Sequence, residues 1–594
     1  MSTGNRNGKH IANMQLDRRK MLGGAAAGLG IFGGGMVFGN AVAAAPSGVR
    51  GPSLVRTQQE LPEDAAPAEQ QIFHVVGNAS TAKVLDFYVK VYERVEGYVS
   101  DLFSEPLVRV DKNFQIQPAA AESWEGSEDG RTWTFKIREG LMWSDGNPVT
   151  ANDWIASFQN GADPEFAWDF TWFFQGVLSN WSEAIAGEVG VEDIGVRAGA
   201  SEYELVFETV SPAPYLPAML LYSLPLSAAG LAENGPLYNT EPATAISSGP
   251  FILSEWLPDQ QVTVVRNEAY TGTLPVYLSE MRSTLTTPDN YFTLYQNDEI
   301  DYMANPAPAA LEIMMSDEAT ASEVYQGVGD FPTYYIFFDV TQPPFDNLQV
   351  RQAWSHAIDR DTLASQILGP NGVPAYSWLA PGFPAANGEQ LSSIQAFDPE
   401  LARSLLAEAG YPDGEGFPAQ ELQLRAPTPL EQTVAAALAA MLKEHLNIDV
   451  ELLQRDAQGY MADLTAKPTQ MLLGFVRYGM DFFDPYNMLS VWLSGGRHSW
   501  TSETFDTAIL EAAEFLGPTE ERIAMFNEAE RILVEDVPAV FVYHGTEVQF
   551  IKPWLLGDFK EPDENGIAAL HWPGYTTMST VPANLYIGAE APSR

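Results

Sequence analysis

A short apolar run, Met471 to Val476, constrains the fold of this chain more than any other feature. The run has the length of a strand buried inside a sheet. A cation, aromatic rings and a carboxylate follow it before a turn at Pro485. Such a strand brings charge and flat rings to one edge of the sheet, and open α/β sheets bind ligands at such edges. The plainer alternative is that Asp484 and Pro485 only form a turn and that Asp481 only caps a helix.

Length, charge and composition exclude several classes of protein. A chain of 594 residues is too long for one core and predicts two or three domains. The formal net charge of −46 repels nucleic acid and anionic lipid, so we exclude both as partners. There is no Cys, which excludes disulfides, thiolate metal sites and a Cys nucleophile.

Motifs of catalysis and metal binding are also missing from the sequence. No G-x-S-x-G, H-E-x-x-H or G-x-x-x-x-G-K-[ST] occurs, and no two of the seven His lie four residues apart. We therefore expect no catalytic residues, no metal site and no cofactor. With 78 acidic residues, paired carboxylates are inevitable, so a secreted hydrolase that uses two carboxylates stays open as an alternative.

The N-terminal segment has the features of an export signal. Arg18 and Arg19 precede a mildly apolar, glycine-rich run from Met21 to Ala45, which ends in the A-x-A pattern of a cleavage site. This arrangement resembles a twin-arginine signal and predicts a signal peptide over residues 1–43, followed by a flexible leader over 44–69. A membrane anchor is the alternative, because the run is long enough to span. The glycines and the cleavage pattern argue against it, so we expect no stable membrane insertion after removal of the signal.

The rest of the chain carries a series of aromatic, turn and charged blocks in a fixed order. Read one by one, most of them are structural: Trp124, Trp133 and Trp143 are expected in a core, and Arg351 in a salt bridge or cap. The blocks are Glu122 to Trp124, Glu128 to Arg138, Trp143 to Trp154, Ser248 to Phe251, Pro343 to Asp346, Val350 to Ala353, Ala357 to Arg360, Ala407 to Pro412, Ala529 to Pro538 and Val548 to Trp554. Their order resembles the extracytoplasmic solute-binding proteins of family 5, the peptide and nickel binders of ABC importers.

This resemblance implies a bilobal α/β fold, the type II periplasmic-binding-protein fold with an extra inserted domain, which closes on its ligand about a hinge. Lobe I would consist of residues 70–105, 242–330 and 545–594. An inserted domain II would cover 106–241, and lobe II (domain III) would cover 331–544.

The resemblance also implies a function and a set of site residues. The protein would be the substrate-binding receptor of an ABC importer, a soluble periplasmic monomer that captures oligopeptides or dipeptides and delivers them to the permease subunits. Peptide-binding relatives hold the ligand's α-amino group with a carboxylate, and the match places that role on Asp481. Arg477 would meet a ligand carboxylate, and Tyr478, Phe482 and Trp500 would wall the cleft. An oligosaccharide, an opine or a nickel chelate remains an alternative ligand for the same fold.

Overall fold

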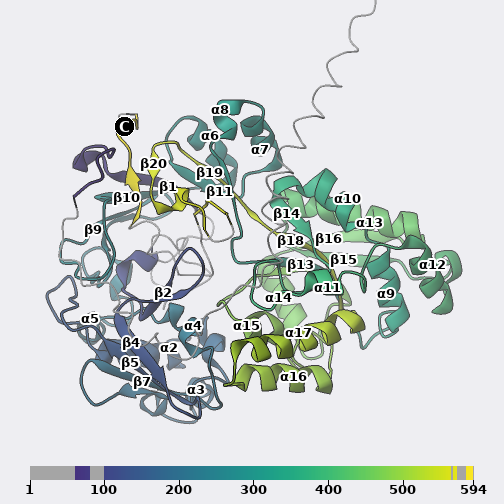
Figure 1. Cartoon of the computed structure of the whole chain (residues 1–594), viewed down its shortest axis with the longest axis horizontal. Helices are drawn as coiled ribbons and strands as arrows, with labels where there is room; N and C mark the ends of the chain where they lie inside the picture. The colour runs from purple at the N-terminus through teal and green to yellow at the C-terminus, as the bar shows by residue number, and fades with distance from the viewer. Residues whose placement is uncertain (1–59, 80–99, 564–565, 571–583, 593) are drawn as a thin grey trace, which may run out of the picture.

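The computed structural model describes residues 60–79, 100–563, 566–570, 584–592 and 594. Strands and helices of this part gather into three bodies, which Figure 1 shows at the upper left, the lower left and the right of the molecule. We call them lobe I, domain II and lobe II, with the residue ranges given above. The expected signal peptide lies outside the described residues.

Lobe I contains two sheets built from distant parts of the chain. The larger has the strand order β1-β10-β9-β8, and the smaller has the order β11-β19-β12. The strands are β1 (Ile72–Asn78), β8 (Phe251–Leu257), β9 (Gln261–Arg266), β10 (Glu280–Thr286), β11 (Tyr302–Ala304), β12 (Val324–Gly327) and β19 (Glu547–Ile551), with a small pair β20 (Leu555–Leu556) and β21 (Tyr586–Ile587). The helices are α6 (Tyr291–Gln296), α7 (Pro308–Met315) and α8 (Glu318–Ala321). Because β19 pairs with both β11 and β12, the C-terminal part of the chain completes this lobe.

The start of lobe I corrects one expectation from the sequence. The leader was expected to be flexible as far as residue 69. Instead, Ala65 forms a β-bridge with Gly588, and the backbone N–H of Ala66 donates to the carbonyl of Ile587. The small side chain of Ala66 is buried there, and the Gln71 side chain bonds both Ala66 and Ile587. This part of the leader is held because it supplies backbone bonds to β21.

Domain II is a sheet covered by short helices and many aromatic side chains. Its sheet has the order β4-β5-β7-β6, and β2 and β3 form a separate hairpin. Its elements are β2 (Val108–Val110), β3 (Ile116–Pro118), β4 (Ala121–Gly126), β5 (Thr132–Ile137), β6 (Val196–Ala198), β7 (Glu204–Glu208), α2 (Ala151–Ala162), α3 (Trp181–Ile185), α4 (Leu216–Met219) and α5 (Ala228–Asn234). Trp124, Trp133 and Trp143 are buried in this core, as predicted.

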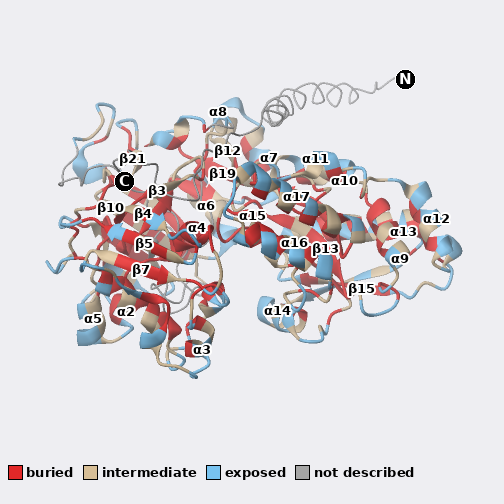
Figure 2. Cartoon of the chain, turned by 60° about the horizontal axis from the view of Figure 1, so that its bottom comes forward, coloured by how far each residue is buried: buried red, intermediate tan, exposed pale blue. Residues whose placement is uncertain are grey.

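Lobe II is a six-stranded mixed sheet with helices on both faces. The strand order is β14-β18-β13-β17-β15-β16. The strands are β13 (Thr333–Phe338), β14 (Gly372–Pro374), β15 (Gln420–Arg425), β16 (Val450–Arg455), β17 (Leu473–Tyr478) and β18 (Ala539–Gly545). The helices are α9 (Leu348–His356), α10 (Arg360–Leu363), α11 (Gly388–Leu391), α12 (Pro399–Glu408), α13 (Pro429–Leu446), α14 (Ala457–Thr465), α15 (Pro485–Ser490), α16 (Glu503–Glu514) and α17 (Thr519–Asp536). Figure 2 shows its buried residues concentrated between the strands and these helices.

The predicted buried strand is β17, in the interior of this sheet. It pairs antiparallel with β13 and parallel with β15. Leu473 and Phe475 belong to the core on one face, and Val476 belongs to the core on the other. A strand with a core on each face must be apolar throughout, which explains the unbroken run in the sequence. The charge begins only at Arg477, where the strand leaves the core.

Two segments of chain connect lobe I with lobe II. Residues 328–332 run from β12 to β13, and Thr546 joins β18 to β19. The segments are adjacent, since the N–H of Gly545 donates to the carbonyl of Pro332 at 2.8 Å. In the first segment, Gly329 and Phe331 have φ angles of 56° and 51°, in the left-handed region that side chains rarely adopt. Two adjacent connections of this kind fit a hinge between two lobes.

Candidate functional site

The loop between β17 and α15 places the candidate binding residues, and we call residues 479–484 the anchor loop. Helix α15 begins at Pro485, and the Asp484 side chain accepts a hydrogen bond from the N–H of Tyr486 at 2.9 Å. Asp484 is therefore the N-cap of this helix. The interpretation of Asp481 as a mere helix cap is wrong, because the structure gives that role to Asp484.

Asp481 is a buried carboxylate whose hydrogen-bond partners among the described residues are all neutral. It is 5% exposed. Its Oδ2 accepts hydrogen bonds from the Tyr478 hydroxyl at 2.6 Å and the Asn487 amide at 3.1 Å, and its N–H donates to Asn487 Oδ1 at 2.8 Å. Burial raises the pKa of Asp481 from 3.8 to about 6, and the two side-chain hydrogen bonds lower it only in part. Such a carboxylate would be strongly stabilised by a cationic ligand group.

Ligand affinity is therefore expected to depend on pH through Asp481. Because the pKa without ligand is about 6, the group is ionised at pH 8 and takes up a proton as the pH falls through 6. The affinity for an ammonium ligand should be constant above pH 7 and fall by up to about ten-fold per pH unit below pH 6. Calorimetric titrations from pH 8 to pH 4.5 test this. The fall should be absent from an Asp481→Asn variant, and an equal fall in that variant would assign the pH dependence to another group.

Tyr478 lies beside Asp481, whereas Arg477 is turned toward the hinge. The Tyr478 ring packs nearly parallel to Trp378, and the Arg497 guanidinium lies 5.4 Å from the centre of the same ring. Arg477 Nη1 lies 3.4 Å from Asp330 Oδ1 in a partly exposed ion pair. The carboxylate of Asp330 also lies against Gly479, where an added Cβ would meet its Oδ2 at 2.1 Å. A side chain at position 479 would therefore displace the Asp330 carboxylate, which packs against the anchor loop here.

Phe482 and Trp500 do not wall an open cleft. Phe482 is buried in the core of domain II, where it contacts Phe173 edge-on and Tyr215. Trp500 is buried inside lobe II; its indole N–H donates to Asp536 and its ring contacts Phe505 edge-on. Both rings were expected at the ligand. They bury their apolar area against protein instead, which is the usual placement of large aromatic side chains.

The structure adds polar groups that sequence reasoning missed. The Asn487 side chain accepts from the Asp481 N–H and donates to the Asp481 carboxylate, and Tyr222 of domain II donates from its hydroxyl to the Asp481 carbonyl at 2.7 Å. Beside the hinge, at the start of β19, burial raises the pKa of Glu547 to about 7, and the charge of Asp330 adds to this. Tyr222 and Glu547 come from distant parts of the chain, whereas Asn487 lies only six residues after Asp481; no local sequence pattern marks any of them. Arg351 behaves as predicted and bonds the carbonyls of Phe345, Asp536 and Val537.

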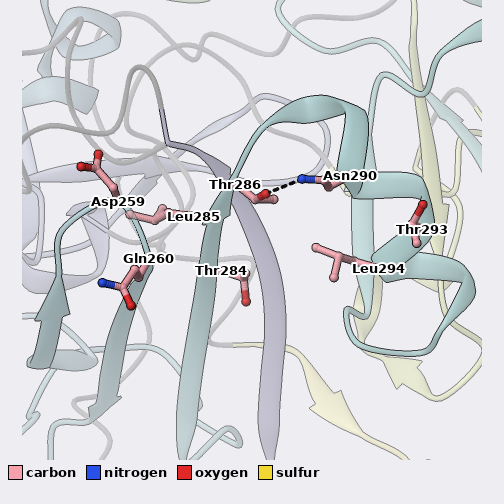
Figure 3. Close-up of a pocket in the computed structure, with 8 residues that line it drawn as sticks. All are labelled: Asp259, Gln260, Thr284, Leu285, Thr286, Asn290, Thr293 and Leu294. Carbon is pink, nitrogen blue, oxygen red and sulfur yellow. Dashed lines mark hydrogen bonds between the residues drawn. The ribbon is translucent and has the colours of Figure 1, made fainter.

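A separate cavity of about 390 Å³ lies on lobe I (Figure 3). It is formed by the β8–β9 turn, the end of β10 and helix α6, and includes Thr284, Thr286, Asn290 and Leu294. Asn290 donates to Thr286 across one side of it at 2.8 Å. It shares no residue with the anchor loop or the hinge, so it is not part of the candidate site.

The described residues include neither a metal site nor a membrane-spanning helix. In that part of the chain, no three His, Cys, Asp or Glu side chains come together in a way that could hold a metal ion. None of the helices described there combines the length and apolar character that a membrane crossing requires.

Comparison with known proteins places this architecture in a family. The model of the bacterial extracellular solute-binding proteins, family 5, matches residues 115–500. The periplasmic oligopeptide-binding protein OppA of Escherichia coli K12 is 27% identical over 521 residues, which cover 85% of this chain and 93% of that relative. The probable deoxycholate-binding periplasmic protein YgiS of the same strain is 26% identical over 508 residues, covering 84% and 92%.

A solved structure supports the fold. The oligopeptide-binding protein OppAIV of Borrelia burgdorferi aligns with a TM-score of 0.70 at 22% identity, over 87% of this chain and 100% of that one. The bilobal periplasmic-binding-protein fold is therefore confirmed. Because the family model covers more than half of its length, this chain belongs to the bacterial extracellular solute-binding proteins of family 5.

Proposed function

We propose that this protein is the substrate-binding receptor of an ABC importer and that it captures peptides by their free α-amino group. The observation that carries the proposal is Asp481, a buried carboxylate in the loop that follows β17, which the described part of the chain bonds through neutral groups alone. The name of the relative OppA, which records oligopeptide binding, supports the same ligand class. We further propose that the protein acts as a monomer in the periplasm and delivers its ligand to membrane permease subunits.

The chemistry of Asp481 favours a cationic ligand group over the alternatives. An α-ammonium group supplies three donors and a full positive charge, and both compensate the buried carboxylate. A neutral oligosaccharide supplies donors without charge. An anion such as the deoxycholate in the name of one relative would face the negative charges of Asp481 and Asp330. A nickel chelate or an opine would be stabilised by Asp481 only if it placed a positively charged group where the α-ammonium group of a peptide would lie.

Binding is expected to occur without turnover. A matching peptide at 100 times its dissociation constant should raise the free energy of unfolding by about 2.7 kcal/mol, because it binds only the folded state. A thermal-shift screen with Ala-Ala-Ala, Lys-Ala-Lys, penta-alanine, maltotriose and deoxycholate tests the ligand class. Mass spectrometry of the recovered ligands tests turnover. Stabilisation by peptides that are recovered intact supports the peptide receptor. Cleavage of the peptides at catalytic rates would favour a hydrolase. Stabilisation by maltotriose alone would favour a sugar-binding receptor.

A further inference from the structure

The polypeptide chain connects domain II directly to lobe I and not to lobe II. Its two ends enter and leave lobe I near residues 105 and 242, whereas lobe II joins lobe I through the hinge. Buried bonds reinforce the first connection. Arg109 of domain II forms a buried ion pair with Glu105 at 2.7 Å and donates to the Thr273 hydroxyl of lobe I at 2.9 Å. Rotation at the hinge would therefore move domain II together with lobe I, away from lobe II.

The anchor loop nevertheless inserts its aromatic residues into domain II. Phe482 lies in the buried core of domain II, between Phe173 and Tyr215. The next ring, Phe483, stacks on Phe114 in the β2–β3 hairpin, with ring centres 5.1 Å apart. The loop thus contacts two separate parts of domain II through two consecutive side chains.

A hydrogen bond joins domain II to the backbone of Asp481 itself. The Tyr222 hydroxyl donates to the Asp481 carbonyl at 2.7 Å in a fully buried position. The Tyr222 ring is held edge-on by Phe170 and Phe173, so its hydroxyl is directed by packing within domain II. In an open state, the Asp481 carbonyl would be solvated by water and the Phe482 ring would lose its apolar pocket. Both groups are therefore satisfied together only when domain II is docked on lobe II.

We propose that Tyr222 and Phe482 are positioning residues that link docking of domain II to the placement of the ligand carboxylate of Asp481. The inference rests on the proposed function, since it treats Asp481 as the ligand anchor. In the docked state, Tyr222 and the Phe482 pocket hold the loop, and Asn487 and Tyr478 hold its carboxylate. When the two bodies separate, the loop loses its support from domain II, and the ligand is released from a less ordered anchor. These contacts control the release rate of the ligand more than its capture rate.

The first test measures docking directly. The chain has no Cys, so dyes can be attached at two introduced cysteines, Glu188→Cys on domain II and Glu444→Cys on lobe II, both exposed positions. Single-molecule energy transfer then reports the docked fraction. Because the contacts join protein groups, a docked population is expected without added peptide. Tyr222→Phe should reduce the ratio of docked to open molecules by about ten-fold, and Phe482→Ala should reduce this ratio by roughly 10- to 100-fold.

The second test measures the rates of peptide release and capture by stopped flow, with the best peptide of the panel above. Tyr222→Phe should raise the dissociation rate by about ten-fold and change the association rate by less than about two-fold. Tyr460→Phe is the matched control, because its hydroxyl donates to the Phe475 carbonyl at 3.1 Å, entirely within lobe II. This control should lower stability without changing the docked fraction or the dissociation rate.

The outcomes separate this inference from the proposed function. If no peptide binds the wild type, the proposed function fails, while the energy-transfer populations still decide whether Tyr222 and Phe482 control docking. Unchanged populations in both variants would overturn the inference, even where peptide binds tightly. Equal effects of Tyr222→Phe and Tyr460→Phe would also overturn it, since they would reflect lost stability alone.

Discussion

Replacing Asp481 by Asn should abolish tight peptide binding while leaving a folded, unliganded protein. Loss of one member of a buried charge pair typically costs about 2–5 kcal/mol of binding free energy. That corresponds to an affinity lower by roughly 30-fold to several thousand-fold. The Asn side chain keeps the shape, and its carbonyl oxygen can accept the bonds from Tyr478 and Asn487. Calorimetry of the variant measures the loss directly.

The same replacement should increase the stability of the unliganded protein above pH 6. Burial raises the pKa of Asp481 from 3.8 to about 6, so stability associated with this group is present at low pH and is lost as the pH rises through 6. A shift of about two pH units corresponds to about 3 kcal/mol, which is an upper bound for the gain in Asp481→Asn at pH 7. Urea denaturation of both proteins at pH 7 and pH 4.5 measures it. A variant that is equally destabilised at both pH values would show that the carboxylate is structural.

Replacing Arg522 by Met should cause the largest loss of stability in this region. Arg522 donates two hydrogen bonds to the Asp484 carboxylate, at 2.7 and 3.0 Å, and the two side chains are only 9% and 5% exposed. Removal of the guanidinium leaves Asp484 charged and buried without compensation, which typically costs about 3–5 kcal/mol. Denaturant unfolding of the unliganded protein measures this change.

A matched control is available on the same helix. Arg531 of α17 forms exposed ion pairs with Glu528 and Glu535, so Arg531→Met should change stability by at most about 1 kcal/mol. Asp484→Asn should weaken the start of α15 and its bond to Arg522, with a smaller effect on affinity than Asp481→Asn. Equal losses in Arg522→Met and Arg531→Met would show that the buried pair does not stabilise the fold.

The elements that depend on local patterns were predictable from the sequence. The run before Arg477 became β17, and Thr150 forms a capping box with Asp153 at the start of α2. In both cases the residues that decide the structure lie within a few positions of each other. The blocks that resemble the family led to the correct fold because their order extends along the chain.

The site was less predictable because it is assembled from distant segments. Asp484 directly precedes Pro485 and caps α15, a local arrangement, whereas its buried bonds to Arg522 come from far along the chain and could not be read from the local sequence. Phe482 was expected at the ligand because the resemblance to the family implied it, but domain II supplies a deeper apolar environment. No pattern near Asp481 could reveal Tyr222, which comes from another domain.

Calorimetric titration of the wild type at pH 7.5 with one peptide and with its N-acetyl derivative tests the central claim most directly. Acetylation removes the positive charge of the α-amino group and leaves the rest of the ligand unchanged. If Asp481 binds that group, the free peptide should bind and the acetylated one should lose roughly 30-fold or more in affinity. Equal affinities for the two peptides would contradict the claim and place the ligand anchor elsewhere in the protein.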